Sequence, residues 1–557
     1  MEKLTATASK TTLPEWYSPE TGIYSSKHPP KPLPADPFLD VVSFIFSHHN
    51  HNGLTALIDS STGFSISYSK ILPLVKSVAS GLSNMGIKQG DVVLLLLPNS
   101  IHFPIVFLGV LYLGGIVSTM HPLSSELGVK QRIVDCNACI AFVELEKVGK
   151  FQPLGIPVIG VPENVNLDEK IYSKGDLGVK PVIRQQDTAA IMYSSGTTAA
   201  SKGVVLTHRN FISMVELFVK FEASQYEYSS TDNVYLAVLP MFHIYGLSLF
   251  VVGLLSLGSS IVVMRKFDDS EMVKVIDRYG VTHFPVVPPI LTALTRTAKG
   301  VCGNSLKCLK LVSCGAAPLF GKTIQDFVEV LPHVDFIQGY GLTESTAVGT
   351  RGLNTEKFQK YSSIGLLAPN IEAKVVDWIT GALLPPGGSG ELWIRGPGVM
   401  KEYLNDEEAT ALTIDKDGWL HTGDVVYADH DGYLYVVDRL KEIIKYKGFQ
   451  FVDLYVRILS LLQIAPADLE AVLISHCEIL DAAVIPVVDK ECGEIPVAFV
   501  VKRQGSMLTQ EAIINYVAEQ VAPYKKVRKV IFTQSIPKSA AGKILRRELR
   551  CSLTSKL

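Results

Sequence analysis

Short apolar runs alternate with helix-like segments along the first half of the chain. Between about Asp36 and Lys266, the strand-like runs are GDVVLLLLP, AAIMY, VYLAVLP and SIVVM. Strands that helices cover on both faces are continuous apolar runs of this kind, because neither face meets water. The alternation therefore predicts a layered α/β architecture with largely buried sheets, and it continues through VTHFPVVPP and LKLVSCGAAP.

Two charge-free stretches are long enough to resemble membrane spans. Val92 to Met120 contains Pro98, Pro104 and several glycines, so we expect a strand, a turn and a helix. Ile244 to Met264 is interrupted by glycines and a Ser-Ser pair, which favours a buried helix followed by a strand. Neither stretch is flanked by the clusters of basic residues that accompany membrane spans, so none is expected.

The texture of the sequence changes after Gly365. Short strands and Gly/Pro turns follow, as in TGALLPPGGSGELWIRG and DGYLYVVDR, and they predict a β-rich subdomain. A smaller segment of mixed helices and strands follows Asp438-Arg439-Leu440-Lys441. The length of 557 residues also favours more than one domain.

Residues 193–204 read YSSGTTAASKGV and have the small, hydroxyl-rich composition of a phosphate-binding loop. A Walker A loop requires G-x-x-x-x-G-K-[ST], and here the second glycine and the hydroxyl after Lys202 are missing. Walker loops also open directly onto a helix. This loop lies between two predicted strands, and a helix is expected only near Thr207. The pattern excludes a P-loop ATPase while keeping a phosphate-binding role.

Four further motifs accompany the loop. Gln338 to Glu344 (QGYGLTE) combines glycines, a stacking tyrosine and a carboxylate suited to Mg²⁺. Thr422-Gly423-Asp424 presents a carboxylate suited to ribose hydroxyls, and a basic run extends from Asp438 to Gly448. Pro537 to Lys543 (PKSAAGK) ends at a lysine preceded by glycine. Each motif alone is weak evidence of function, but the five motifs in this order and spacing are highly specific.

In these five motifs the chain resembles the adenylate-forming acyl-CoA synthetases, and most closely the plant 4-coumarate–CoA ligase-like proteins with a peroxisomal tail. The resemblance extends from about residue 37 to the end. It implies a large N-terminal domain of two α/β subdomains and a small β-barrel, followed by a small mobile α+β lid. The expected boundaries are an N-terminal extension at 1–36, the AMP-binding domain at 37–438, a hinge at 439–441 and the lid at 442–557.

The resemblance also implies a reaction in two steps, with ATP, Mg²⁺ and coenzyme A. A carboxylate attacks the α-phosphate of ATP to give acyl-AMP and pyrophosphate, and the coenzyme A thiol then displaces AMP. The first step requires positioned cations and N–H donors, because negative charge spreads over the α-phosphate and the departing pyrophosphate in the transition state. Lys543 is expected to catalyse adenylation by bridging the acyl carboxylate and the α-phosphate, and His243 is the second expected catalytic residue.

The same resemblance assigns the binding residues. The nucleotide site is expected to comprise Ser194, Ser195, Gly196, Thr197, Thr198, Lys202, Gln338, Gly339, Tyr340, Thr343, Asp424, Arg439 and Lys445. Glu344 is the expected Mg²⁺ ligand and Lys441 the expected hinge. The acyl pocket is expected to contain His243, Tyr245, Ala316 and Gly339, and the coenzyme A site Lys266, Lys447 and Gly448. For His243, a core histidine bonded to the backbone is the alternative.

Charge and the chain ends limit the partners. The formal net charge of −2 provides no basic field for nucleic acid. The N-terminal stretch has no apolar core of the secretory type, which argues against secretion. The chain ends in Ser555-Lys556-Leu557, a peroxisomal address, so we expect binding to the import receptor and a location in the peroxisome. A monomer is expected.

Two departures from the family pattern bear on catalysis. Ala199 stands where the family usually has glycine; if its backbone is left-handed, alanine costs roughly 1 kcal/mol, and weaker ATP binding is expected. Phe451 to Gln463 is an apolar insert between GFQ and the helix start APADLE. It is either the product of incorrect splicing or gene annotation, or a variant loop over the coenzyme A tunnel. We expect it to impair thioester formation more than adenylation.

Three functions stay open at this stage. The first is an acid–CoA ligase for a hydroxycinnamate, a fatty acid or an oxylipin precursor. The second is a luciferase-like oxidase, which also forms an adenylate and can also end in Ser-Lys-Leu. The third is a catalytically impaired protein that binds an acyl group or a nucleotide, owing to the insert. Formation of acyl-CoA, light emission and pyrophosphate exchange distinguish the three.

Overall fold

The computed structural model describes the chain from residue 14 to residue 554 with several gaps. The described residues are 14–47, 51, 53–162, 180–194, 201–226, 229–300, 305–352, 359–446, 462–489, 493–539 and 542–554.

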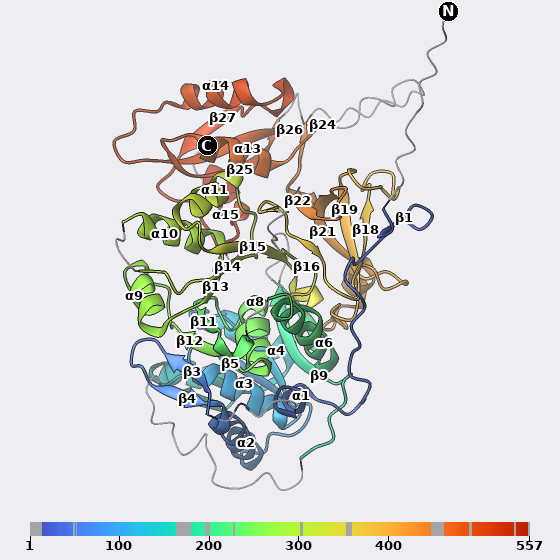
Figure 1. Ribbon diagram of the computed structural model, residues 1–557, viewed down its shortest axis with the longest axis vertical. Helices are drawn as coiled ribbons and strands as arrows, with labels where there is room; N and C mark the ends of the chain where they lie inside the picture. The colour runs from blue at the N-terminus through green and yellow to red at the C-terminus, as the bar shows by residue number, and fades with distance from the viewer. Residues whose placement is uncertain are drawn as a thin grey trace, which may run out of the picture.

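A seven-stranded sheet and a nine-stranded sheet form the large N-terminal part (Figure 1). In the seven-stranded sheet the strand order is β20-β10-β9-β6-β5-β7-β8. Strand β5 is buried along its whole length, as its unbroken apolar run predicts. The bounds are β5 Val92–Leu96, β6 Ile116–Thr119, β7 Ala138–Glu144, β8 Val158–Val161, β9 Thr188–Ser194, β10 Lys202–Thr207 and β20 Glu402–Tyr403.

The nine-stranded sheet has the order β17-β16-β15-β14-β13-β11-β12-β3-β4, and the strands from β15 to β3 are parallel. Parallel strands bring their carboxyl ends to one edge, where ligands bind in open α/β sheets. The bounds are β3 Thr55–Asp59, β4 Ser65–Ser67, β11 Val234–Ala237, β12 Ser260–Val263, β13 His283–Val286, β14 Leu311–Cys314, β15 Asp335–Tyr340, β16 Thr350–Arg351 and β17 Leu366–Leu367.

Helices cover these sheets and bury the apolar runs. The central helix α3 (His102–Tyr112) is buried almost throughout and follows β5, so the first charge-free stretch forms the predicted strand, turn and helix. It also contains a second strand, β6, which was not predicted. No helix among the described residues has both the length and the apolar character needed to cross a membrane. The other helices of this part are α1 Val41–Ser47, α2 Tyr68–Asn84, α4 Glu126–Cys136, α5 Val148–Phe151, α6 His208–Met214, α7 Phe221–Ala223, α8 Ile244–Gly246, α9 Asp269–Tyr279, α10 Pro288–Lys299, α11 Gly321–Val330 and α12 Glu407–Thr413.

Among the residues that the structure describes, two helical segments take π geometry. They are η3 (Val215–Lys220), between α6 and α7, and η5 (Leu247–Gly253), which continues α8 and leads into the 3-10 turn η6 (Leu254–Ser256). Periodicity in the sequence does not distinguish them from α-helix. Single π turns within helices are frequent at functional sites.

The predicted β-rich subdomain is a six-stranded antiparallel sheet of order β1-β2-β18-β19-β21-β22. Its first two strands come from the N-terminal segment, which the sequence analysis treated as an extension, and β2 pairs with β18. The bounds are β1 Tyr17–Ser18, β2 Ile23–Ser25, β18 Glu372–Val376, β19 Gly390–Arg395, β21 Leu420–Ala428 and β22 Leu434–Arg439.

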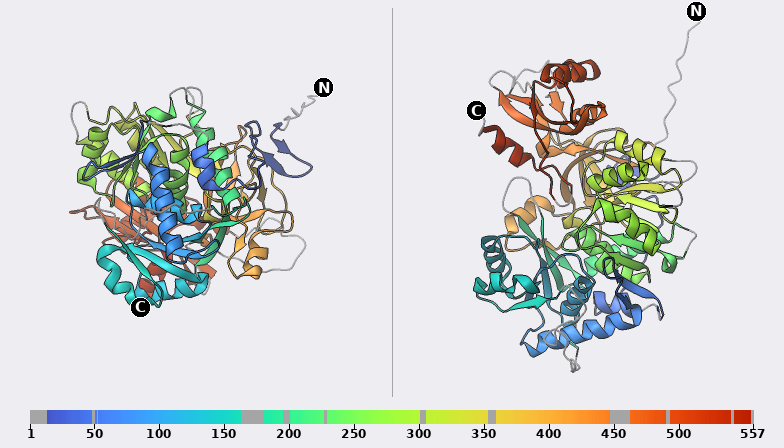
Figure 2. Two further views of the ribbon diagram at one scale, coloured as in Figure 1. Left: turned by 90° about the horizontal axis from the view of Figure 1, so that it is seen from below. Right: turned by 90° about the vertical axis from the view of Figure 1, so that its left-hand side faces the viewer.

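The C-terminal part lies at one end of the molecule and has hydrophobic cores of its own, centred on buried residues such as Leu469, Val484 and Ile485 (Figures 1 and 2). The turn η8 (Leu440–Glu442) connects it to β22. Its helices are α13 Pro466–Ser475, α14 Gln510–Gln520 and α15 Arg546–Thr554, and its strands are β23 Ile444–Tyr446, β24 Leu462–Ile464, β25 Ile479–Asp489, β26 Gly493–Lys502 and β27 Lys529–Phe532.

The predicted insert lies mostly outside the described residues. Its last two residues, Leu462 and Gln463, belong to β24, where Leu462 pairs with Tyr446 and Gln463 with Lys445 of β23. The last two residues of the predicted insert and Ile464 thus form one strand, which leads into α13.

Candidate active site

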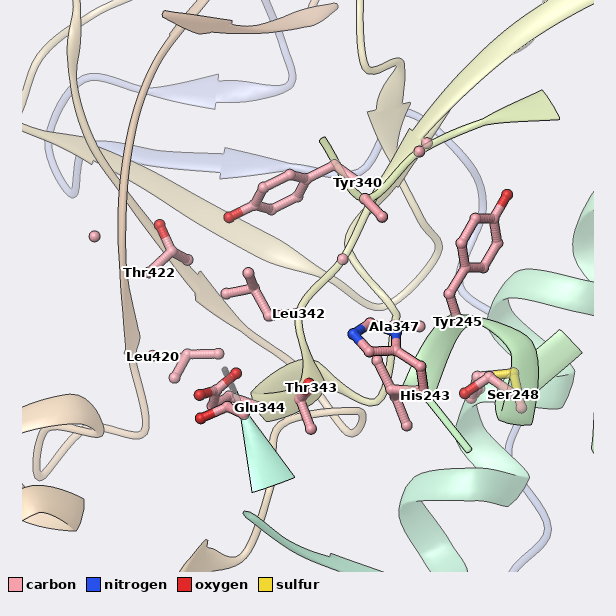
Figure 3. Close-up of a pocket in the computed structure, with 18 of the residues that line it drawn as sticks. His243, Tyr245, Ser248, Tyr340, Leu342, Thr343, Glu344, Ala347, Leu420 and Thr422 are labelled. Atoms are coloured by element: carbon pink, nitrogen blue, oxygen red, sulfur yellow. The ribbon is translucent and has the colours of Figure 1, made fainter. Parts of the chain in front are cut away.

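A cavity of about 470 Å³ lies where the parallel sheet, the β9–β10 hairpin, the six-stranded sheet and the C-terminal part meet (Figure 3). Its lining includes twelve of the residues that the sequence analysis assigned. They are Ser194, Lys202, His243, Tyr245, Ala316, Gly339, Tyr340, Thr343, Glu344, Arg439, Lys441 and Lys543.

The β9–β10 hairpin positions the ends of the phosphate-binding motif. Lys202 is paired with Ser194 across the two strands, so both residues reach the cavity from the base of the loop. A capping box between Thr207 and Asn210 then starts α6, at the position the sequence predicts. Ser195, Gly196, Thr197, Thr198 and Ala199 lie outside the described residues.

Glu344 lies on the 3-10 turn η7 (Thr343–Ser345), just after β15. Its Oε1 accepts a hydrogen bond of 2.9 Å from the hydroxyl of Tyr403. The ammonium of Lys202 lies 4.8 Å from the centre of the same tyrosine ring, a cation–π contact. Tyr403 thus connects a cation and a carboxylate of the cavity, and the sequence analysis did not identify it. It reaches this place because β20 pairs with β10.

Strand register brings together Asp424, whose carboxylate suits ribose hydroxyls, and Arg439 of the predicted nucleotide site. Asp424 of β21 lies opposite Arg439 of β22, and the Arg439 Nε is 3.2 Å from Asp424 Oδ1. The hydroxyl of Tyr340 donates a hydrogen bond of 2.7 Å to Asp424 Oδ2. Burial and the neighbouring Asp424 carboxylate raise the pKa of Tyr340, so its hydroxyl stays a donor. Asp424 is 4% exposed and stands behind Tyr340 and Arg439, which line the cavity themselves.

Lys543 enters the cavity on a loop that is fastened at both ends. The Ser539 amide donates to the Lys543 carbonyl, and the Lys543 amide donates to Ser539 Oγ. Gly542 has a φ of 77° and lies against Pro289, so a side chain there would be strained and crowded. The loop therefore packs against the N-terminal end of α10 at Gly542, the residue next to Lys543.

Burial and the nearby Arg439 guanidinium lower the pKa of Lys543 to about 8, against the opposing effect of Asp424 and Glu344. Burial and the Lys543 ammonium lower the pKa of His243 to about 4. His243 is therefore a neutral imidazole at physiological pH. Its ring can accept or donate one hydrogen bond, but it contributes no positive charge.

One side of the cavity is apolar and rests on the two π segments. Phe218 and Val219 come from η3, Leu249 from η5, and Ala347 from the loop after η7. In Figure 3, Tyr245 and Ser248 lie on one side of the cavity, and Leu420 and Thr422 on the other. We call the side formed by Phe218, Val219, Leu249 and Ala347 the apolar arm of the cavity. Because it lies next to a polar, charged region, the cavity suits a ligand with an apolar tail and a charged head.

Several predicted residues are not in the lining. Gln338 is a buried residue of β15 and does not line the cavity; its side-chain amide donates to the Tyr361 carbonyl at 2.7 Å. Lys266 is exposed after β12 and does not line the cavity. Lys445 is described only as part of the β23 backbone, and Lys447, Gly448 and the terminal Ser555, Lys556 and Leu557 lie outside the described residues. Their roles stay predictions.

The Glu344 carboxylate fits the way proteins bind Mg²⁺. Mg²⁺ commonly takes one or two carboxylates together with substrate phosphates and water, not a cage of protein ligands. Among the described residues, no group of three or more His, Cys, Asp or Glu side chains is placed to hold a metal ion. Glu344 lines the same cavity as Lys202, next to the phosphate-binding hairpin, so its carboxylate is suitably placed for an ion bound to phosphates.

Comparison with known proteins identifies two matching family models. The model "AMP-binding enzyme" matches residues 47–404, and the model "AMP-binding enzyme C-terminal domain" matches residues 468–543.

The chain is 60% identical to 4-coumarate–CoA ligase-like 6 of Arabidopsis thaliana, over 97% of this chain and 95% of the relative. It is 44% identical to the peroxisomal OPC-8:0-CoA ligase 1 of Arabidopsis thaliana, over 94% of this chain and 95% of the relative. The fold is similar to that of ATP-bound MatB from Rhodopseudomonas palustris, with a TM-score of 0.82, 24% identity and coverage of 92% of this chain and 98% of that structure.

Proposed function

The chain belongs to the AMP-binding enzyme family and is an acid–CoA ligase that uses ATP, Mg²⁺ and coenzyme A, and we propose that it activates a carboxylic acid with a long apolar body in the peroxisome. The observation that carries the proposal is one cavity in which Lys543 and Glu344 border an apolar arm. An acid whose carboxylate is bound by Lys543 has its charged end at the phosphates and its apolar body among Phe218, Val219 and Leu249.

In the first step, a carboxylate oxygen of the acid forms a bond to the α-phosphorus of ATP. The bond from that phosphorus to the bridging oxygen breaks, and its electron pair leaves with pyrophosphate. The Lys543 ammonium offsets the charge that develops on the α-phosphate and the attacking carboxylate. Lys202 and the loop that it borders bind the β- and γ-phosphates. Glu344 is the residue that would hold Mg²⁺ together with the phosphates, and the ion would supply further charge neutralisation.

In the second step, the thiol of coenzyme A loses its proton and its sulfur forms a bond to the acyl carbon. The bond from that carbon to the AMP oxygen breaks, and its electron pair leaves with AMP. His243, which is neutral at physiological pH, lies beside the acyl end of the cavity and can hydrogen-bond the acyl group in either step. Tyr340, Arg439 and Asp424 retain the AMP moiety until it departs.

Two observations support the cellular location. The sequence ends in the Ser-Lys-Leu tripeptide, and a relative at 44% identity is named a peroxisomal ligase. A fluorescent protein fused before residue 1 is expected to enter peroxisomes with the tripeptide and to stay outside them without it. Import of both forms would contradict the assignment.

A panel of hydroxycinnamic, fatty and cyclic oxylipin-type acids tests the activity. We expect exchange of labelled pyrophosphate into ATP with at least one acid, and AMP release that requires coenzyme A. Lys543→Met is expected to lower the exchange rate by about 10²–10³-fold, as loss of a positioned donor does. Light or CO₂ from an oxygenated adenylate, without acyl-CoA, would instead indicate an oxidase. Absence of exchange with every acid would contradict catalysis.

A further inference from the structure

A buried ion pair lies beside the apolar arm of the cavity. Arg351 lines the cavity with a side chain only 6% exposed, and its Nη2 donates to Glu222 Oε1 at 2.9 Å. The Arg351 Nε contacts the other carboxylate oxygen of Glu222. The two residues come from β16 and α7, far apart in the sequence. A buried guanidinium is uncommon in a site for apolar tails and requires an explanation.

The backbone of the active site makes room for this guanidinium. Arg351 lies opposite Gly339 across β15 and β16. A Cβ on Gly339 would stand 2.9 Å from Arg351 Nη1, closer than real Cβ contacts allow. The Arg351 Cζ also lies 5.1 Å from the centre of the Phe218 ring, a cation–π contact with η3. Arg351 is therefore held in one place at the wall of the arm.

A second buried polar group lines the same arm. Ser248 of η5 is 3% exposed and lines the cavity, and its Oγ has no hydrogen-bond partner among the residues that the structure describes. A buried hydroxyl without a hydrogen-bond partner is destabilising. Its neighbours Leu249 and Val219 are apolar and cannot satisfy it. A ligand oxygen in the arm would remove that cost.

The charges favour a neutral oxygen over a second carboxylate. Glu222 already balances the Arg351 charge, and its carboxylate holds the Arg351 pKa above the ordinary value for arginine. A ligand carboxylate would enter a site of no net charge and lie near Glu222, where desolvation of the new charge is not offset. A ketone or hydroxyl oxygen accepts a hydrogen bond from Arg351 or Ser248 without that cost.

We propose that Arg351 and Ser248 make the enzyme selective for acids with an apolar body and a neutral oxygen, a ketone or hydroxyl, away from the reacting carboxylate. The inference rests on the proposed acid–CoA ligase function and narrows its substrate class. Arg351 and Ser248 act as specificity-determining residues. Glu222 is a positioning residue for Arg351.

Matched acids that differ by one oxygen test the inference. For saturated acids from six to twelve carbons, we compare each plain acid with its (ω−1)-oxo, ω-hydroxy and ω-carboxy counterparts. The measured quantity is kcat/KM for coenzyme A-dependent AMP release. A hydrogen bond from a charged donor, worth about 1.5–3 kcal/mol, predicts at least a tenfold preference for an oxo or hydroxy acid at the best length. Equal or better use of the plain acids, or best use of the dicarboxylic acids, would overturn the proposal.

Substitutions at Arg351 and Ser248 test whether these two residues cause the preference for oxygenated acids. Arg351→Met is expected to reduce the ratio of oxygenated to plain acid to near one, and Ser248→Ala to lower it severalfold. Arg296→Met, at an exposed arginine of α10 paired with Asp269, is the matched control and should leave the ratio unchanged. An unchanged ratio in both pocket variants would overturn the assignment. If Arg351→Met does not fold, the wild-type ratio and Ser248→Ala decide.

The rate of pyrophosphate exchange tests the acid–CoA ligase function independently of the proposed selectivity for oxygenated acids. Exchange with plain and oxygenated acids alike leaves the ligase function intact and rejects only the selectivity. Exchange with no acid rejects the function and the selectivity with it.

Discussion

Lys543 carries a lowered pKa because it is buried next to Arg439, and this has a consequence for pH dependence. The charged form stabilises the transition state, so activity is present below the lowered pKa and is lost as pH rises through it. We expect kcat/KM for ATP in the pyrophosphate-exchange assay to fall above about pH 8. Lys543→Arg keeps the charge at all accessible pH values, so the remaining activity should lose this alkaline decline.

A lysine elsewhere in the C-terminal part provides the control for this prediction. Lys525 forms an ion pair with Asp468 and does not line the cavity. Ion pairs at the surface contribute little, so Lys525→Met should retain both the rate and the decline near pH 8. A wild-type profile that stays flat to pH 10, with exchange proceeding, would contradict the role given to Lys543.

Tyr403 is the second residue with a specific expectation. Its hydroxyl fixes the Glu344 carboxylate while its ring contacts Lys202, and Tyr403→Phe removes only the first contact. A hydrogen bond to a charged group is worth about 1.5–3 kcal/mol, so we expect KM for Mg-ATP to rise about tenfold. Tyr435→Phe removes a similar bond to Asp429, away from the cavity, and should leave KM unchanged. Equal KM values for the two variants would disprove the positioning role.

These residues show what the sequence could predict about the site. Lys543 and Glu344 belong to short motifs whose residue types and order are specific, so the amino-acid sequence alone identifies them. Tyr403 and Arg351 reach the cavity only through the pairing of β20 with β10 and of β16 with β15. Register between strands far apart in the chain is not encoded in a local pattern, so these two were missed.

Among the elements, the strands were the most predictable. Runs such as Val92–Leu96 are apolar at every position because both faces of the sheet are covered. The helix after β10 was predicted to start near Thr207, which caps it. The π geometry of η3 and η5 was not foreseen, because the spacing of apolar residues in the sequence does not distinguish a π turn from an α-helix.

The helix formed by α8 and η5 depends on one glycine at its start. A Cβ on Gly246 would overlap the carbonyl oxygen of Pro240, and backbone cannot move aside as a side chain can. Gly246→Ala should therefore displace the segment that carries Tyr245 and Ser248. We expect a loss of roughly 1–3 kcal/mol in unfolding free energy and a higher KM for the acid. Thermal unfolding and initial rates measure the two effects.

The matched control is a glycine in an open place. Gly149 lies in α5 with nothing near its virtual Cβ, so Gly149→Ala should be neutral or slightly stabilising. If Gly246→Ala unfolded at the same temperature as Gly149→Ala and kept the wild-type KM, the close approach to Pro240 would be unimportant.

At the scale of the whole molecule, the C-terminal part places Lys543 in the cavity, as the role that we propose for it in the first half-reaction requires. Lys543 lines the cavity, and Asp438, at the end of β22, accepts a hydrogen bond of 2.9 Å from the Ala467 amide of α13. Thioester formation in the same cavity requires access for coenzyme A, and we propose that the part rotates about Lys441 for this step. That rotation would break the contact between Asp438 and α13.

Deleting part of the predicted insert tests whether adenylation and thioester formation depend on different parts of the chain. The strands β23 and β24 pair with Tyr446 opposite Leu462, and the chain connects them through residues 447–461. Deleting 451–461 shortens this connection and leaves both paired segments in place. The predicted coenzyme A residues Lys447 and Gly448 belong to the same connection, whereas Lys543 and Glu344 do not. We therefore expect acyl-CoA formation to rise severalfold in the deletion variant, with pyrophosphate exchange changed less than twofold.

The two rates must be measured on the same preparation, because a loss of folded protein would lower both together. Rapid mixing of coenzyme A with enzyme that already holds acyl-AMP isolates the second step from the first. A wild-type rate of thioester formation in the deletion variant would show that the extra residues are neutral for catalysis. A parallel fall in exchange and thioester formation would show that the extra residues stabilise the C-terminal part and do not act on one step alone. The β23–β24 pair borders the core of that part at Ile444 and Ile464, so a change nearby can affect folding.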